Sequence, residues 1–166
     1  MKIAIIGYSG AGKSTLAETL SNYYSIPKLH MDTLQFQPGW QDSDREWMLG
    51  EMKNFLTKHE AWVIDGNYSW CCYEERMQEA DQIIFLNFSP WTCLFRAFKR
   101  YLTYRGKVRE SMAAGCPERF DWEFIRWILW DGRTKNAKER YQRVQENYPE
   151  KVIVLRSQKE MDHFLE

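Results

Sequence analysis

A glycine-rich segment near the start of the chain constrains the fold more than any other feature. Residues 7–14 read Gly-Tyr-Ser-Gly-Ala-Gly-Lys-Ser and match the pattern G-x-x-x-x-G-K-[ST] completely. The segment lies between a strand-like apolar run over 2–6 and a helical stretch over 13–24, which is the context this phosphate-binding pattern requires. A Gly-rich turn without a ligand is the alternative, but it does not call for Lys13 and Ser14 at those places. The segment therefore predicts a nucleotide-binding P-loop.

The chemistry of such a loop identifies the nucleotide contacts. Glycines let the backbone turn tightly and direct successive N–H groups at phosphate oxygens, and the helix that follows adds the positive end of its dipole. Lys13 is expected to reach the β- and γ-phosphates, and the Ser14 hydroxyl to bind Mg²⁺. ATP and Mg²⁺ are thus the predicted ligands. The predicted cofactor-binding residues are Gly7, Ser9, Gly10, Ala11, Gly12, Lys13, Ser14 and Thr15.

Short apolar runs alternate with longer amphipathic stretches along the chain, as in βαβ units on a parallel sheet. Strands are expected over 2–6, 28–31, 61–64, 82–88 and 151–155, and helices over 13–24, 45–58, 90–104 and from 122 towards 147. At 166 residues the chain fits a single domain. The predicted fold class is α/β, a three-layer P-loop fold with helices on both faces of the sheet.

The helix boundaries rest on capping residues. Asp44 and Asp121 are predicted N-caps, and Ser89-Pro90 combines an N-cap with Pro at the first helical position. Two Gly- and Pro-containing segments, 33–43 and 105–120, are expected to be irregular and to lie at the carboxyl edge of the sheet.

Two carboxylates follow predicted strands at that edge. Asp65 ends an apolar run, as in a Walker B element, and is predicted to hold Mg²⁺ together with Ser14. Asp32 follows the second strand and is predicted to orient or deprotonate an acceptor hydroxyl. Asp also makes turns, so a turn-forming role is the alternative for both residues. His30 is interpreted as a core residue.

Charge is distributed unevenly in a chain whose net charge is +0. Between Arg96 and Arg143 there are thirteen Lys and Arg residues against six Asp and Glu residues, a net charge of +7. Arg96 and Arg100 are four residues apart and share one helix face. A seven-residue spacing, expected to give one face of the next helix, relates Arg119, Arg126, Arg133 and Arg140. Such a set could clamp phosphates, although a solvated basic face is the alternative for each single arginine.

Other features of the sequence bear on the location and the binding partners of the protein. The four cysteines lack the paired spacing of a zinc site, which favours free thiols and a cytoplasmic location. No apolar stretch approaches the roughly 18 residues of a membrane span, and neither a signal peptide nor a membrane partner is expected. The neutral net charge also argues against direct nucleic-acid binding. Oligomeric state stays open.

Several segments together resemble the bacterial topology-modulation proteins, which belong with the adenylate-kinase-like P-loop kinases. The segments are the P-loop, Leu29–Asp32, Phe36–Trp40, Asp65–Tyr68, the helix over 96–105, and Trp122–Arg133. The resemblance implies a five-stranded parallel sheet in the order 2-3-1-4-5. It also implies an acceptor-binding insert over 33–60, a lid over 105–120, and phosphate contacts by Arg96, Arg100 and either Arg126 or Arg133.

These observations lead to two functional hypotheses. The first is a small-molecule kinase with Lys13, Asp32, Arg96, Arg100 and Arg133 as catalytic residues. Its acceptor, a nucleotide or another hydroxyl or phosphate compound, is expected to contact Asp32, Phe36, Trp40, Asn67 and Tyr68. The second is a nucleotide-dependent regulatory protein that influences DNA topology and has little kinase activity. The basic stretch over 96–143, with its interleaved Tyr and Trp residues, motivates this alternative.

Overall fold

A five-stranded parallel sheet forms the centre of the computed structural model, which describes residues 1–166. Its order is β2-β5-β1-β6-β7. The strands are β1 (Lys2–Gly7), β2 (Lys28–His30), β5 (Trp62–Asp65), β6 (Gln82–Leu86) and β7 (Val152–Leu155). Numbered among themselves in chain order, they follow 2-3-1-4-5, so the predicted topology and fold class are confirmed.

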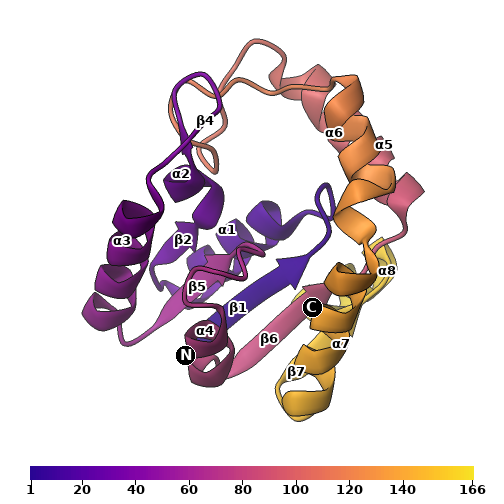
Figure 1. Cartoon of the computed structure of the whole chain (residues 1–166). Helices are drawn as coiled ribbons and strands as arrows, with labels where there is room; N and C mark the ends of the chain where they lie inside the picture. The colour runs from indigo at the N-terminus through magenta and orange to yellow at the C-terminus, as the bar shows by residue number, and fades with distance from the viewer.

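Helices cover both faces of this sheet (Figure 1), with α4 and α7 on the near face and α1 and α8 on the far face. The helices are α1 (Lys13–Tyr24), α2 (Met31–Gln35), α3 (Arg45–Lys58), α4 (Tyr73–Glu79), α5 (Pro90–Tyr104), α6 (Trp122–Leu129), α7 (Lys135–Asn147) and α8 (Gln158–Leu165). A 3-10 helix, η1 (Asp131–Arg133), lies between α6 and α7. None of the helices is both long and apolar enough to cross a membrane.

Capping explains why two helices begin where the sequence predicts. The Asp44 carboxylate accepts a hydrogen bond from the backbone N–H of Trp47 at 2.9 Å and starts α3. The Ser89 hydroxyl accepts from the N–H of Thr92 at 3.1 Å, with Pro90 at the first position of α5. Each cap satisfies an N–H group that has no partner within the helix.

The prediction of one helix from Trp122 towards Asn147 is wrong. Helix α6 ends at Leu129, because Trp130 leaves the helical conformation with φ −134° and ψ −62°. A new helix, α7, begins after Thr134, whose hydroxyl accepts from the N–H of Ala137 at 3.2 Å. The four arginines spaced by seven residues therefore do not share a helix face.

The segment 33–43 is also more ordered than predicted. Met31 begins helix α2 instead of ending a strand, and α2 leads into a hairpin of β3 (Phe36–Gln37) and β4 (Gln41–Asp42). Helices α4 and α8 were not predicted. By contrast, the segment 105–120 contains no helix or strand, as the sequence indicated.

The hydrophobic core surrounds the central strand. Ile3, Ala4, Ile5 and Ile6 of β1 have 0% exposure, because both faces of a central parallel strand are covered. The core cluster contains 31 buried residues and includes the fully buried ring of Trp62. Five of the eight tryptophans, in contrast, are exposed, so many of the aromatic side chains lie on the surface and not in the core.

Two arms rise from the carboxyl edge of the sheet and meet above it (Figure 1). One arm is the β3–β4 hairpin, and the other consists of α5, α6 and the segment 105–120. The Gly39 N–H donates to the Gly115 carbonyl at 3.0 Å, and the Cys116 thiol donates to the Gln37 carbonyl at 3.1 Å. These contacts join the arms into a closed ring.

Two glycines with different surroundings provide a matched test of the fold. Gly66 has φ +142°, and an added Cβ would lie 2.7 Å from the Cβ of Met31. Gly50 lies exposed in α3 with no atom near its added Cβ. We expect Gly66→Ala to lower the free energy of unfolding by about 1–3 kcal/mol. Gly50→Ala should raise it by about 0.5–1 kcal/mol. Urea unfolding of both variants checks this, and equal effects would contradict it.

Candidate functional site

The P-loop turns through two glycines whose backbone conformation disfavours any side chain. Gly10 has φ +80°, and a Cβ there would lie 2.5 Å from the Cys93 carbonyl oxygen of α5. Gly12 has φ +99°, and its added Cβ would meet a guanidinium nitrogen of Arg96 at 3.1 Å. Left-handed backbone of this kind favours glycine and lets N–H groups point into a common concavity. The loop therefore has the backbone shape of an anion cradle.

Lys13 bends back over this loop. Its Nζ donates to the carbonyls of Gly7 at 3.0 Å and Tyr8 at 3.2 Å. Burial lowers the pKa of Lys13, while the nearby Asp32 and Asp65 carboxylates oppose that shift. The ammonium group is thus poorly hydrated and held above the loop, so a phosphate anion is a better partner for it than two neutral carbonyls.

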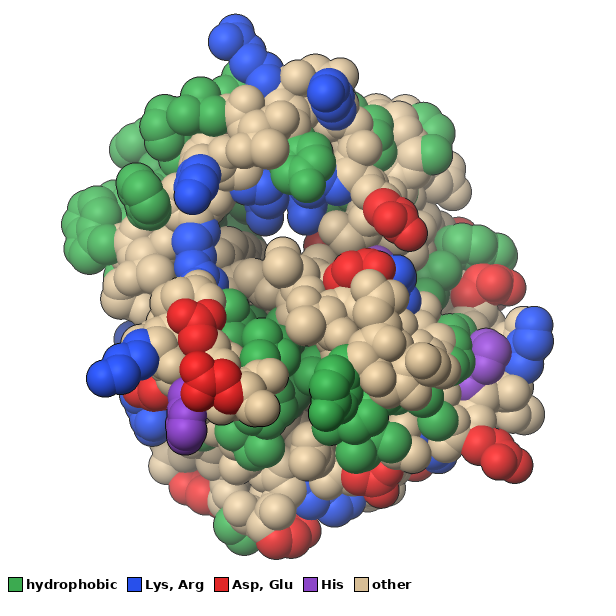
Figure 2. Space-filling view, turned by 180° about the vertical axis from the view of Figure 1, so that it is seen from behind, with side chains coloured by type: hydrophobic (Ala, Val, Ile, Leu, Met, Phe, Trp, Pro, Cys, Tyr) green, Lys and Arg blue, Asp and Glu red, His purple; other side chains and the backbone are tan.

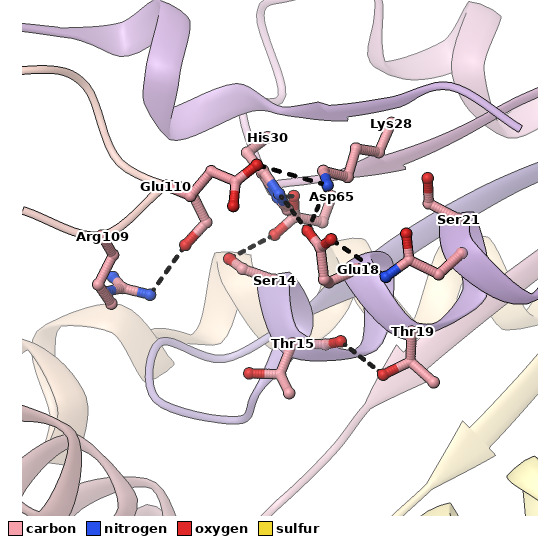
Figure 3. Close-up of polar contacts among 12 residues, drawn as sticks. Ser14, Thr15, Glu18, Thr19, Ser21, Lys28, His30, Asp65, Arg109 and Glu110 are labelled. Carbon is pink, nitrogen blue, oxygen red and sulfur yellow. Dashed lines mark hydrogen bonds and ion pairs between the residues drawn. The ribbon is translucent and has the colours of Figure 1, made fainter. Parts of the chain in front are cut away.

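A buried carboxylate links three elements beside the loop (Figure 3). Asp65 is only 4% exposed; its Oδ2 accepts from the Ser14 hydroxyl at 2.8 Å, and its Oδ1 lies 2.6 Å from His30 Nδ1. Because an ionised carboxylate only accepts, His30 Nδ1 is the donor. Parallel pairing of β2 with β5 places His30 opposite Asp65 and creates this contact. His30 is buried, as predicted, but it also orients a site residue.

Hydroxyl and carboxylate oxygens are the ligands that Mg²⁺ prefers. Ser14 and Asp65 bring one of each within hydrogen-bond distance at the mouth of the P-loop. The donor set therefore fits the metal ion that the sequence predicted, and it lies where phosphates on the loop would share it.

The loop after β5 secures the P-loop from the side. The Asn67 side chain accepts from the Gly7 N–H at 3.0 Å and donates to the Gly7 carbonyl. Arg76, which is fully buried in α4, donates to the carbonyls of Gly66 and Tyr68, each at 3.2 Å. Burial lowers the pKa of Arg76 to about 10. Asn67, predicted to bind the acceptor, is thus engaged with the P-loop backbone, and its acceptor role stays a prediction.

On the opposite side of the site, Asp32 meets aromatic residues. Its Oδ1 accepts a hydrogen bond from the Tyr68 hydroxyl at 2.6 Å. Burial and the neighbouring Asp32 raise the pKa of Tyr68, so the phenol stays protonated and remains a donor. Phe36 and Trp40 of the hairpin contact each other edge to face, with their ring centroids 5.2 Å apart. Arg119 lies over the Trp40 ring at 5.3 Å.

The predicted arginines all face the site, but protein groups hold each of them. Arg100 donates to Glu118 at 3.0 Å, and Arg109 bonds the other oxygen of the same carboxylate. Arg96 donates to the Ala11 carbonyl and to the side chain of Gln158.

Arg133 is held at the base of the P-loop. It donates to the Phe88 carbonyl at 3.0 Å and lies over the Tyr8 ring at 3.8 Å. Together with the arginines on the segment above, it surrounds the P-loop with fixed positive charge.

Most of the side chains described above line one cavity of about 1150 Å³. Figure 2 shows the hollow from behind, with Lys and Arg side chains along its upper rim. The predicted site residues that line it are Ser9, Gly10, Gly12, Lys13, Ser14, Thr15, Asp32, Phe36, Trp40, Asp65, Asn67, Tyr68, Arg96, Arg100 and Arg133. Gly7 and Ala11 do not line it, and Ala11 has no exposed surface.

Sequence reasoning missed three residues that shape this cavity. Trp127 donates from Nε1 to the Ser9 hydroxyl at 3.0 Å and covers the P-loop. Glu118 positions two arginines, and Arg76 supports the loop that carries Asn67. Trp127 lies within the segment Trp122–Arg133, but nothing in that segment indicates a contact with the P-loop, and Arg76 lies in no motif. An acidic residue within a basic segment was the one available signal for Glu118.

Comparison with known proteins shows the fold alone. No protein-family model and no curated protein matches the chain. It is similar to a solved shikimate kinase from Bacteroides thetaiotaomicron, at 17% identity and a TM-score of 0.50 over 99% of this chain and 94% of that chain. Two further similar structures are a deoxyadenosine kinase from M. mycoides (18% identity, 93% and 90% covered, TM-score 0.49) and a gluconokinase from Sinorhizobium meliloti (17%, 93% and 81%, 0.48).

The contact between Asn67 and the P-loop is testable without a ligand. We expect Asn67→Ala to lower the free energy of unfolding by about 1–3 kcal/mol, because the N–H and carbonyl of Gly7 lose their partner. Asn54→Ala, on the exposed face of α3, should change it by less than about 0.5 kcal/mol. Chemical denaturation measures both variants. Equal stabilities would show that the Asn67 contact does not hold the loop.

Proposed function

We propose that the protein is an ATP-dependent P-loop kinase that transfers the γ-phosphoryl group to a small acceptor. The observation that carries the proposal is that one cavity is lined both by the P-loop residues Lys13 and Ser14 and by Asp32 and the hairpin aromatics. Donor and acceptor would thus occupy one space beneath the closed arms. Catalysis of phosphoryl transfer depends mainly on holding the donor and the acceptor in line with each other, and the protein has little covalent chemistry to perform.

The donor side would hold the triphosphate. Backbone N–H groups of the loop and the Lys13 ammonium would bind the β- and γ-phosphates, exchanging the carbonyl contacts of Lys13 for charged ones. Ser14 and Asp65 would hold Mg²⁺, which neutralises phosphate charge when bound. His30 would keep Asp65 oriented towards that position.

The acceptor side would hold a hydroxyl or phosphate near Asp32. One Asp32 oxygen accepts from Tyr68, which leaves the other oxygen to accept a hydrogen bond from the acceptor. The rings of Phe36 and Trp40 would cover the apolar part of the acceptor. Arg96, Arg100 and Arg133 would stabilise charge on the transferring group, with Glu118 keeping Arg100 in place.

The contacts between the arms support the insert and lid roles of 33–60 and 105–120. A backbone hydrogen bond of 3.0 Å joins Gly39 to Gly115, next to Trp40, which lines the cavity. A lid in this position would exclude water from the transfer and prevent loss of phosphate by hydrolysis.

The second candidate is the nucleotide-dependent regulator of DNA topology. The observation that favours it is the set of exposed rings of Trp122 and Trp130, both outside the core, in the most basic part of the chain. Such rings can stack on unpaired bases beside cations that contact phosphates.

An acceptor screen tests the kinase. Purified protein with Mg²⁺ and ATP is incubated with nucleoside monophosphates, nucleosides, sugars and hydroxy acids, and ADP formation is recorded. We expect ADP release that depends on one acceptor class and that Lys13→Ala abolishes. Slow ADP release at one rate for every acceptor, combined with DNA affinity that falls steeply with salt, would favour the regulator instead.

Asp32 gives a second test once an acceptor is known. We expect Asp32→Asn to lower kcat by about 10²- to 10⁴-fold, because the amide cannot take the acceptor proton. Asp81→Asn, at the opposite edge of the sheet, is the matched control and should leave kcat unchanged. Normal turnover by the Asp32 variant would remove this residue from the mechanism.

A further inference from the structure

Helix α5 exposes an apolar stripe on the face that points away from the cavity. Trp91 and Phe95 are each 68% exposed, Leu102 is 57% exposed and Phe98 is 42% exposed. Their spacings of four, three and four residues place them on one side of the helix. Cys93 and Ala97, on the other side, are buried. Figure 2 shows hydrophobic side chains gathered along the edge of the molecule that α5 and α6 form.

We propose that this stripe is the interface of a homodimer, in which α5 packs antiparallel against α5 of a second copy. The proposal does not depend on the kinase function. It concerns a surface that the cavity and the P-loop do not use.

The stripe is complementary to itself in the antiparallel direction. Alignment about its centre pairs Trp91 with Leu102 of the second copy and Phe95 with Phe98. Each layer then combines large apolar side chains in the manner of knobs packing into holes. An interface of this isologous kind closes after two copies.

The charges beside the stripe tolerate the same arrangement. Lys99 is the exposed cation that borders the stripe along its length. In the antiparallel alignment it lies level with Leu94 of the second copy, and the two Lys99 residues are offset by about 7.5 Å along the pair. Arg105 follows the last residue of α5 and lies beyond the overlap.

The exposed area is sufficient for the core of a dimer interface. Large side chains of this type bury about 150–250 Å² each, so the exposed parts of the four amount to roughly 450 Å² per copy. A standard interface buries about 800 Å² per partner. The stripe supplies more than half of that area, and the bordering Thr92, Leu94, Lys99 and Tyr101 would supply the remainder.

Sedimentation velocity across a concentration series tests the dimer. We expect wild-type protein to sediment with twice the chain mass of 20.0 kDa, and Phe95→Glu to sediment as a monomer. Tyr23→Glu replaces another exposed aromatic side chain, on α1, and should remain dimeric. Far-UV circular dichroism checks that the variants fold, and Leu102→Lys provides a second variant of the stripe.

Cysteine crosslinking then tests the direction of the helices. The double variant Trp91→Cys, Leu102→Cys should form a disulfide-linked dimer under mild oxidation. Trp91→Cys alone should not, because the two copies of position 91 would lie about 16 Å apart along the pair. Crosslinking of the single variant would show a parallel pair and overturn the arrangement.

Three other outcomes would overturn the proposal. One is a wild-type monomer at every concentration up to about 100 μM. Another is a dimer that persists in both Phe95→Glu and Leu102→Lys. The third is a monomer that binds vesicles containing anionic phospholipid, which would assign the stripe to a membrane surface instead.

Discussion

The buried carboxylate of Asp65 is the interaction on which the site depends. It lies at the end of β5 and binds Ser14 of α1 through one oxygen and His30 of β2 through the other. A buried charge is costly unless hydrogen bonds satisfy it. The arrangement is therefore stable only when β2, β5 and the P-loop helix are all in register. The geometry of the site therefore depends on the strand order of the sheet, because that order brings Ser14, His30 and Asp65 together.

The same dependence explains why much of the fold could be predicted from the sequence. The motif over 7–14 requires a strand before it and a helix after it, and the buried strands carry continuous apolar runs. Helices α3 and α5 begin at the predicted residues, because Asp44 and Ser89 cap them through their own side chains. These signals are local, and a local signal is visible in one sequence.

The elements that were predicted wrongly or missed lack such a capping or motif signal. Helix α4 follows Cys72, a residue with φ +47° that forms no side-chain cap, so no local signal marks its start. The break after α6 depends on packing: a Cβ on Gly132 would lie 2.9 Å from the Trp127 carbonyl oxygen. Regular spacing of arginines across that break indicated a helix face that does not exist. The backbone conformation at Cys72 and the close packing of Gly132 against Trp127 decide these features, and the periodicity of side-chain types does not reveal them.

The site shows the same division. That Lys13, Ser14 and Asp65 lie together could be predicted, because each belongs to a motif with defined chemistry. The engagement of Asn67 with the Gly7 backbone could not, since sixty residues separate them and an Asn-Tyr pair after a strand fits acceptor binding equally well. The role of Arg76 could not be predicted either, because it also depends on a contact made in the folded chain. It supports the same loop from a helix that itself escaped prediction.

Helix α5 connects the cavity with the outer surface of the molecule. Arg96 and Arg100 project from it towards the P-loop and Glu118, while Phe95 and Phe98 point outwards from the adjacent positions. A helix cannot move one face without the other, so a partner that fixes the outer stripe also fixes the two guanidinium groups. The segment 105–120 begins directly after this helix and reaches the β3–β4 hairpin. Rigid packing of α5 would therefore leave the hinge of any closing motion to the residues after Tyr104, where Gly106 adopts φ +73° with no atom near its missing Cβ. A partner on the stripe would then anchor α5 along its length, while closure of the ring would depend on the residues that follow the helix.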